Sequence, residues 1–506
     1  MSRINTNIQS LIAQRNLGQN NKALDQSLER LSTGLRINRG KDDPAGLIAS
    51  ENLRSEKASL SAAITNAERA DQVANIAEGG LQEVSGLLVE LQGLITNTAN
   101  DTGLSSAEKE ANQLQIDSIL QTIDRVAGAT SFQGKKLLNG NLDYNTSDVD
   151  SGVSDFRVNG AKLAFGDDLD VSAIVTTSAQ KAGVVLSTNG ALNLNNGVNS
   201  AFTIEISGSL GSRQLQFASS TTVQNIIDTI NTFTDVTGIA AESVTGTSAI
   251  KLASEAFGSA EFVSVRVIDE ANIQGTGVGI YTLGSQAFNT IDAASGTDFS
   301  NVNAANGIRD TGQDVVATIN GIVATANGKT ARINTDFLDV SVTFDDATAQ
   351  TRATVNAFTI TGGGAAFQLA GTVDIAGKVS IGIADIATRK LGNSNTGYLS
   401  DLASGKGKNV VDGDLTAAQK IVDEAIDQVS SLRGRLGAFQ KNTVGATIRS
   451  LNISLENTTA AESSIRDANF ASETASLTRN QILVSASTNI LALANQQPQS
   501  ALQLLG

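Results

Sequence analysis

The sequence contains no cysteine, histidine or tryptophan, and only two prolines among its 506 residues. Without Cys or His there is no thiol nucleophile, no Ser-His-Asp relay, and no nitrogen or sulfur ligand for a common zinc site. Catalysis by two carboxylates stays formally open, because it needs only two Asp or Glu side chains at a set distance. Solvated turns are the better explanation of the adjacent pairs Asp42-Asp43, Asp167-Asp168 and Asp345-Asp346. The composition therefore predicts a protein that is not an enzyme and that has no cofactor or metal site.

The formal net charge is −15, which disfavours a nucleic-acid partner because the phosphate backbone is itself negative. Long apolar runs are absent too: no stretch approaches the roughly 20 residues needed to cross a bilayer. The segment after Met1 lacks the apolar core of a secretory signal peptide. These features alone predict a cytosolic protein without a membrane span.

Both ends of the chain are free of aromatic residues and carry aliphatic side chains at helical spacing. Steps of three, four and seven predict helices with one apolar stripe. An ordinary amphipathic helix on a monomer core would explain either end alone, but matched stripes at both ends favour pairing, because domain termini often lie close together. Such stripes must be buried against another helix or another subunit. The predicted assembly seam consists of Ile4, Ile8, Leu11, Leu24, Leu28, Leu31, Leu35, Leu477, Val484, Leu491, Leu502 and Leu505.

Three long helices are predicted inside these ends. Asp43 has the character of an N-cap and Pro44 of a first helical residue, and helical spacing continues to about Asn100. Capping boxes, Ser105 to Glu108 and Thr416 to Gln419, open two further helices. Close helix contacts or a bend are predicted where glycines interrupt the first helix, at Gly79, Gly80, Gly86 and Gly93.

Between about Asn141 and Tyr398 the chain becomes rich in Gly, Thr, Ser, Asn and Val. Alternating runs at 202–206 and 340–344 predict half-buried strands, and 221–233 predicts a short helix capped by Thr. The expected fold class is α+β: a long antiparallel helical bundle or coiled coil from both chain ends, with a β-rich insertion in the middle. An insertion of this kind is tolerated at an exposed tip.

Five runs near the two ends of the chain are distinctive: 4–7 (INTN), 28–56 (LERLSTGLRINRGKDDPAGLIASENLRSE), 123–140 (IDRVAGATSFQGKKLLNG), 435–442 (RLGAFQKN) and 462–483 (ESSIRDANFASETASLTRNQIL). In these runs the two ends resemble bacterial flagellin, the subunit of the flagellar filament. The segment from about 201 to 260 is also similar to the hook IN motif of some flagellar proteins.

The resemblance implies three domains and a mechanical function. Residues 1–42 with 463–506 would form a coiled-coil inner tube, 43–175 with 385–462 a helical outer shell with a small β part, and 176–384 a β-rich variable surface. The expected protein is a structural subunit that assembles itself into the extracellular filament, the propeller for swimming. A hook–filament junction protein and an adhesin displayed on the filament remain the alternatives.

Partners and location also follow from the resemblance. Many copies of the chain itself, a flagellar export chaperone, and cap or junction proteins are the expected partners. Flagellins are exported without a cleaved signal, so the expected location becomes extracellular. A chain without Cys and nearly without Pro suits such export, because no disulfide or slow prolyl bond delays folding. Recognition by the innate Toll-like receptor is not expected, since Glu90 and Gly93 replace residues of the motif that it recognises.

Overall fold

The structure is a computed structural model that describes residues 6–100, 103–164, 166–194, 201–244, 248–271, 273, 277–283 and 295–503. Its contacts divide the chain into two compact units. Unit 1 comprises Met1–Ala74, Phe367–Lys378 and Leu436–Gly506, and unit 2 comprises Asn75–Ala366 and Val379–Arg435. The three predicted domains stay a prediction, because these units divide the chain differently and do not test the assembly roles.

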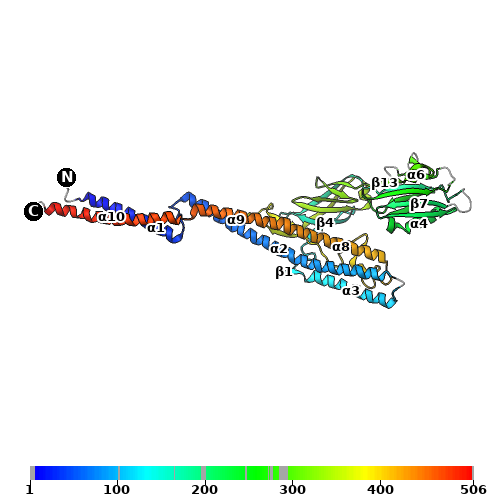
Figure 1. Cartoon of the computed structure of the whole chain (residues 1–506), viewed down its shortest axis with the longest axis horizontal. Coiled ribbons are helices and arrows are strands. Elements are labelled where there is room, and N and C mark those ends of the chain that lie inside the picture. The colour runs from blue at the N-terminus through cyan, green and yellow to red at the C-terminus, as the bar shows by residue number, and fades with distance from the viewer. Residues whose placement is uncertain are drawn as a thin grey trace. The chain divides into compact units, whose positions relative to one another are not determined.

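Long helices come from both ends of the chain, and shorter ones lie between them (Figure 1). A 3-10 turn at Leu399–Leu402 and a π-helical segment at Phe439–Val444 complete the helical elements of the described residues. The predicted fold class is confirmed. The α-helices are α1 (Ile8–Thr33), α2 (Pro44–Thr98), α3 (Ser106–Ala129), α4 (Val223–Asn231), α5 (Thr234–Thr237), α6 (Val302–Asn306), α7 (Asp346–Gln350), α8 (Leu415–Ala438), α9 (Gly445–Arg466) and α10 (Phe470–Gln503).

Local capping signals place most of the helix starts. The Asp43 carboxylate accepts from the Gly46 amide at 2.9 Å, and α2 begins at Pro44 as predicted. Ser105 and Glu108 form the predicted capping box of α3. At α8 the prediction was wrong in detail: the first amides donate to Asp414, at 3.0 Å from Thr416. A carboxylate two residues earlier therefore caps this helix in place of the Thr416 box.

Two aliphatic residues of α2 and α3 lie outside the core faces of these helices. In unit 2, Ile76 of α2 and Leu114 of α3 are exposed. Gln113 takes the inward position beside Leu114, donating to the Leu402 carbonyl and accepting from the Val410 amide at 2.9 Å each. The buried positions of α2 in this unit follow steps of three and four, namely Ala77, Leu81, Val84, Leu88, Leu91, Ile95 and Thr98.

The β-rich part of the chain is built from antiparallel strands, and the predicted strands and helix within it are confirmed. The first hydrophobic core joins the sheets β15-β14-β5-β19-β3 and β16-β17-β18-β4, with Phe344 and Phe358 at its centre. The second joins β12-β6-β10-β9 and β13-β11-β7-β8 and is covered by α4. The second core lies within the chain span of the first: β5 precedes it and β14 follows it.

The strands outside these two cores, β1, β2 and β20 to β23, are only two to four residues long. The strands of the described chain are β1 (Ser131–Phe132), β2 (Lys135–Lys136), β3 (Tyr144–Ser147), β4 (Val153–Ala161), β5 (Leu169–Thr177), β6 (Gly183–Ser187), β7 (Ala201–Gly208), β8 (Ser212–Ala218), β9 (Ile239–Ser243), β10 (Ala249–Ser254), β11 (Phe262–Asp269), β12 (Gly279–Thr282), β13 (Ile308–Thr311), β14 (Val316–Ile319), β15 (Ile322–Val323), β16 (Thr325–Asn327), β17 (Thr330–Asn334), β18 (Leu338–Phe344), β19 (Thr354–Gly363), β20 (Ala365–Gln368), β21 (Lys378–Ile381), β22 (Gly392–Asn393) and β23 (Gly397–Tyr398).

Candidate functional site

The two chain ends meet in unit 1, where α1 and α10 lie side by side and antiparallel (Figure 1). Asn7, the N-cap of α1, donates to the Ala494 carbonyl at 2.8 Å, and Arg30 near the other end of α1 lies 3.9 Å from Glu473. The residues that are most buried between the helices are small: Ser10, Ala13 and Ser27 of α1, and Ser487 and Ala494 of α10.

Polar side chains connect the two helices along their length. Asn20 Nδ2 donates to Ser487 Oγ at 2.6 Å, and Asn480 Nδ2 donates to Ser27 Oγ at 3.1 Å. Near the end of the pair, Ser10 Oγ donates to Asn495 Oδ1 at 2.7 Å. These residues are polar and therefore do not belong to the predicted apolar seam. Their signal was the same heptad spacing carried by Asn and Ser instead of Leu.

The predicted seam residues fall into three groups. Ile8, Leu11 and Leu28 are 54 %, 59 % and 47 % exposed, so the contact with α10 leaves them largely uncovered. Ile4, Leu505 and the side chain of Leu502 lie outside the described residues. The others are half-buried: Leu24, Leu31, Leu35, Leu477, Val484 and Leu491.

Aliphatic side chains remain exposed on the outer faces of both helices. The spacing of Ile8, Leu11 and Ile12 places them on one face of α1. On α10 the corresponding set is Ile482, Leu483, Ile490 and Leu493, all exposed. Scattered exposed aliphatic residues are ordinary, whereas a run of them on adjacent helices marks an interaction surface. We call these two sets the outer faces of the terminal pair.

A short backbone joint follows α1 and precedes α10. Leu35 and Asp467 form an antiparallel β-bridge, and the Ala468 amide donates to the Gly34 carbonyl at 2.9 Å. Arg36 donates from its amide to the Arg466 carbonyl at 2.7 Å, and from Nε and Nη2 to the Ile465 carbonyl at 3.1 and 2.5 Å. A cation on the last carbonyls of α9 complements the negative end of that helix. The joint therefore ties both terminal helices to the end of α9.

The adjacent Asp pairs have structural contacts. The Asp42 carboxylate accepts from the Arg39 amide at 2.9 Å, a bond that lowers its pKa, while Asp43 caps α2. Asp345 caps α7 through the Thr348 amide, Asp346 pairs with Lys329, and Asp167 lies in a turn closed on the Ala164 carbonyl. Turn, cap and ion-pair roles account for Asp42, Asp43, Asp167, Asp345 and Asp346. Among the described residues, no group of three or more acidic side chains could hold a metal ion.

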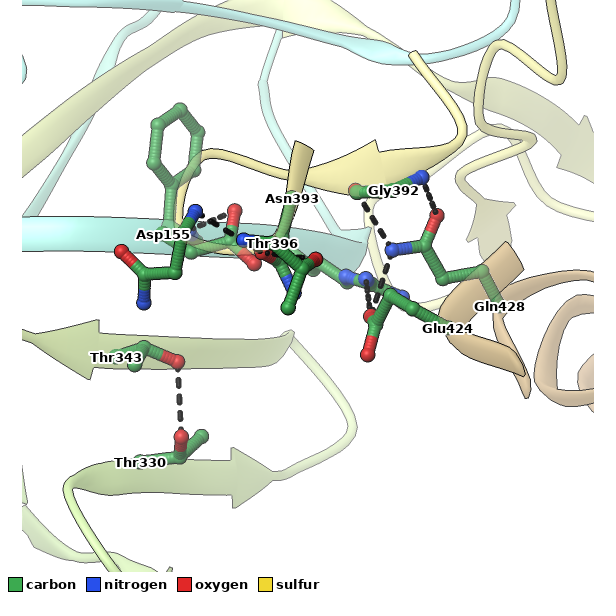
Figure 2. A network of polar contacts seen from close by, with 11 residues as sticks. Asp155, Thr330, Thr343, Gly392, Asn393, Thr396, Glu424 and Gln428 are labelled. Atoms are coloured by element: carbon green, nitrogen blue, oxygen red, sulfur yellow. Dashed lines mark hydrogen bonds and ion pairs between the residues drawn. The ribbon is translucent and has the colours of Figure 1, made fainter. Parts of the chain in front are cut away.

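A polar cleft of about 850 Å³ lies in unit 2, lined by β4, β17, β18, the segment 384–398 and α8. Figure 2 shows how Gln428 of α8 connects its walls: Gln428 accepts from the Gly392 amide at 3.1 Å and donates to the Gly392 carbonyl at 2.8 Å and to Glu424 at 2.7 Å. Arg157 of β4 reaches Glu424 at 3.4 Å. These contacts hold α8 against β4 and the 384–398 segment, which is a structural role.

Burial shifts the pKa of three charged groups in this cleft. It raises the pKa of Asp155, although nearby Arg157 acts in the opposite direction, and it raises the pKa of Asp143. Burial also lowers the pKa of Arg435, whose guanidinium donates to the carbonyls of Gly382 at 2.7 Å and Asn159 at 3.4 Å. Arg435 thereby fastens α8 to two segments of the β-rich part.

Family models match both ends of the chain. The model described as the bacterial flagellin N-terminal helical region matches residues 4–143, and the C-terminal helical region matches 419–505. None of the helices in the described residues has both the length and the hydropathy needed to cross a membrane.

Curated relatives extend this match over the whole chain. Flagellins of Salmonella rubislaw and Salmonella typhimurium are 30 % and 31 % identical to it, each alignment covering 99 % of both chains. The B-type flagellin of Pseudomonas aeruginosa is 29 % identical with the same coverage.

Among solved structures, FliC from Burkholderia pseudomallei is 14 % identical and covers 74 % of this chain and 99 % of its own, at a TM-score of 0.25. The flagellar cap protein FliD of Escherichia coli, D1-D2-D3 domains, is 12 % identical and covers 72 % of this chain and 74 % of its own, at 0.26. Scores this low carry no argument about the fold. From the full-length sequence matches and the two terminal helical regions, the chain belongs to the bacterial flagellin family and is a structural subunit of the flagellar filament.

Proposed function

We propose that neighbouring copies of the chain assemble through the outer faces of the terminal pair, α1 and α10. The supporting observation is the exposure of large aliphatic side chains on helices whose most buried contacts with each other are made by small and polar residues. Ile490 and Leu493 are 59 % and 63 % exposed, although each would gain about 1.5–3 kcal/mol from full burial. Contact with another copy would bury them.

In this proposal the half-buried seam residues act within one chain, and the exposed ones act between chains. Leu24, Leu31, Leu477, Val484 and Leu491 stabilise the pair within one chain, whereas Ile8, Leu11 and Leu28 belong to the surface between copies. The isolated pair offers little apolar burial to offset the conformational entropy lost when two long helices become ordered. The ends are therefore expected to become ordered mainly on assembly.

Export and partners follow from the family. The chain is expected to leave the cell through the flagellar export channel without a cleaved signal, assisted by an export chaperone, and to meet cap and junction proteins at the ends of the filament. On α2, the altered receptor-motif residues Glu90 and Gly93 are exposed. A reversed charge at an exposed position supports the expectation that the Toll-like receptor does not recognise this chain.

The finer alternatives are distinguished by copy number and by binding. A junction protein would be present in few copies per flagellum, whereas a filament subunit would dominate the purified flagella. An adhesive role would reside in the insertion between 176 and 384. The similarity of 201–260 to the hook IN motif remains a prediction about that insertion.

The test is polymerisation of the full chain, measured by pelleting and negative-stain microscopy. Ile490→Gln with Leu493→Gln should leave the monomer folded, because both side chains are exposed, and should abolish filaments. Leu210→Gln is the matched control, since Leu210 is an exposed aliphatic residue in the insertion, between β7 and β8. Normal filament yield from the double variant would contradict the proposal.

A further inference from the structure

We propose that the polar residues between α1 and α10 set the register of the terminal pair, so that each copy presents its outer faces at fixed positions. The inference rests on the proposed function, assembly through those faces. It assigns to Asn20, Ser27, Asn480 and Ser487 a role in specifying the geometry of the pair, distinct from the burial of apolar surface.

The contact between the helices follows a heptad pattern on both sides. Steps of three and four separate successive contact positions, which is the spacing of a coiled-coil seam. Every one of these positions is buried or half-buried: Ser10, Ala13, Leu17, Asn20, Leu24, Ser27 and Leu31 on α1, and Leu477, Asn480, Val484, Ser487, Leu491 and Ala494 on α10.

Two of the polar contacts are reciprocal. Asn20 of α1 donates to Ser487 of α10, and Asn480 of α10 donates to Ser27 of α1. Positions 20 and 27 are one heptad apart, as are 480 and 487, so both pairs form in one register. Asn480 Nδ2 also reaches the Ala23 carbonyl at 3.2 Å. Burying one of these polar groups without a partner costs more free energy than its hydrogen bond contributes when it is formed.

The central aliphatic layer, at Leu24, does not distinguish one register from another. In the observed antiparallel register, the Asn-Ser pairs place Leu24 opposite Val484. A slip of one heptad in either direction places Leu24 opposite Leu477 or Leu491 instead. Leu24 meets an aliphatic side chain in all three cases, so apolar burial at this layer changes little between them.

The polar layers do distinguish the registers. A slip in one direction would place Asn20 opposite Ala494 and Asn480 opposite Gly34. A slip in the other would place Ser487 opposite Ala13, while Asn20 would meet Asn480. Only the observed register forms both Asn-Ser pairs. The joint at Leu35 and Asp467 holds one end of the pair, and these contacts extend the same register along the helices.

Cysteine cross-linking can read this register directly, because the chain has no cysteine of its own. Leu24→Cys with Val484→Cys reports the observed register, and Leu24→Cys with Leu477→Cys or with Leu491→Cys reports the two slipped ones. The pairs are oxidised in filaments of the full chain, and cross-links within one chain are separated from those between chains by electrophoretic mobility.

With the polar residues intact, only the observed pair should cross-link within the chain. In a background of Asn20→Leu and Asn480→Leu, the preference for the observed pair should fall by roughly fivefold per hydrogen bond lost, and the slipped pairs should appear. Asn16→Leu with Asn489→Leu is the matched control, since both residues are exposed on the same helices, and it should keep the observed register. An unchanged preference in the Asn20/Asn480 background would overturn the proposal.

A reciprocal exchange covers the case in which the leucine variants form no filaments. Asn20→Ser alone should lower filament yield or loosen the register, and adding Ser487→Asn should restore both, because the exchange remakes the pair in the same register. If the exchange restores neither the filament yield nor the register, these residues do not set the register. Failure of the otherwise unchanged chain to form filaments would instead contradict the proposed function.

Discussion

Two glycines of α2, six residues apart, should respond in opposite ways to alanine. A Cβ at Gly86 would meet no other atom within 4 Å, so Gly86→Ala removes the entropic cost of glycine and should stabilise the free chain by about 1 kcal/mol. A Cβ at Gly80 would lie 2.7 Å from Leu138 Cδ1 and 2.8 Å from Thr130 Oγ1. Thr130 Oγ1 already donates to the Val126 carbonyl at 2.8 Å, and Leu138 is fully buried, so neither neighbour moves freely.

Overpacking of this kind costs about 1–3 kcal/mol, which cancels or exceeds the helix-propensity gain at Gly80. The two variants should therefore differ in unfolding free energy by about 1–3 kcal/mol, with Gly86→Ala the more stable. Urea unfolding of the unassembled chain followed by circular dichroism measures this difference, and Gly93→Ala repeats the open position as a control. Equal stabilisation by Gly80→Ala and Gly86→Ala would refute the close packing of α2 against Thr130 and Leu138.

Three further changes have defined outcomes. Burial raises the pKa of Asp155 above its ordinary value near 3.8. The protonated carboxyl therefore contributes stability at acid pH, and this contribution is lost as the pH rises through the folded pKa. Asp155→Asn should raise the unfolding temperature at neutral pH, and this gain should vanish under acid conditions. Leu491→Asp places a carboxylate in the α1–α10 contact, at a cost of several kcal/mol if burial is completed, and should prevent pelleting under polymerising conditions, whereas Leu210→Asp should not. The backbones of Gln180 and Gln313 form two hydrogen bonds with each other, at 2.8 and 2.9 Å. Replacing 181–312 by an Asn-Gly turn should therefore leave a chain that folds and that forms thinner filaments in micrographs. An unfolded product, or a folded one that stays monomeric, would contradict this.

Local signals in the sequence predicted the starts of three helices, α2, α3 and α4. Asp43 with Pro44, Ser105 with Glu108 and Thr222 before α4 each satisfy backbone amides within three residues, so no distant part of the chain is needed to identify them. The separation into helical ends and a β-rich middle was predictable for a similar reason, since composition and period change together at its edges.

The faces of the helices and the details of the terminal contact were harder to predict. Leu114 and Gln113 are neighbours, and only the position of the 399–410 segment decides that the glutamine faces inward. Asn20 and Ser487 look like surface residues until two segments far apart in the chain are brought together. Their heptad spacing is visible in each segment, but which polar groups pair depends on contacts between segments far apart in the chain, so an apolar pattern alone does not predict them.

Assembly of the chain without its C-terminal helix tests the central claim most directly. Filament formation by the full chain and by a chain ending at Ser463 should be compared under polymerising salt by negative-stain microscopy, with circular dichroism and unfolding curves as the measure of folding. The account predicts long filaments from the full chain, and from the shortened one a folded monomer that forms none. Long filaments from the folded, shortened chain would contradict the claim that the terminal pair carries the contacts between copies.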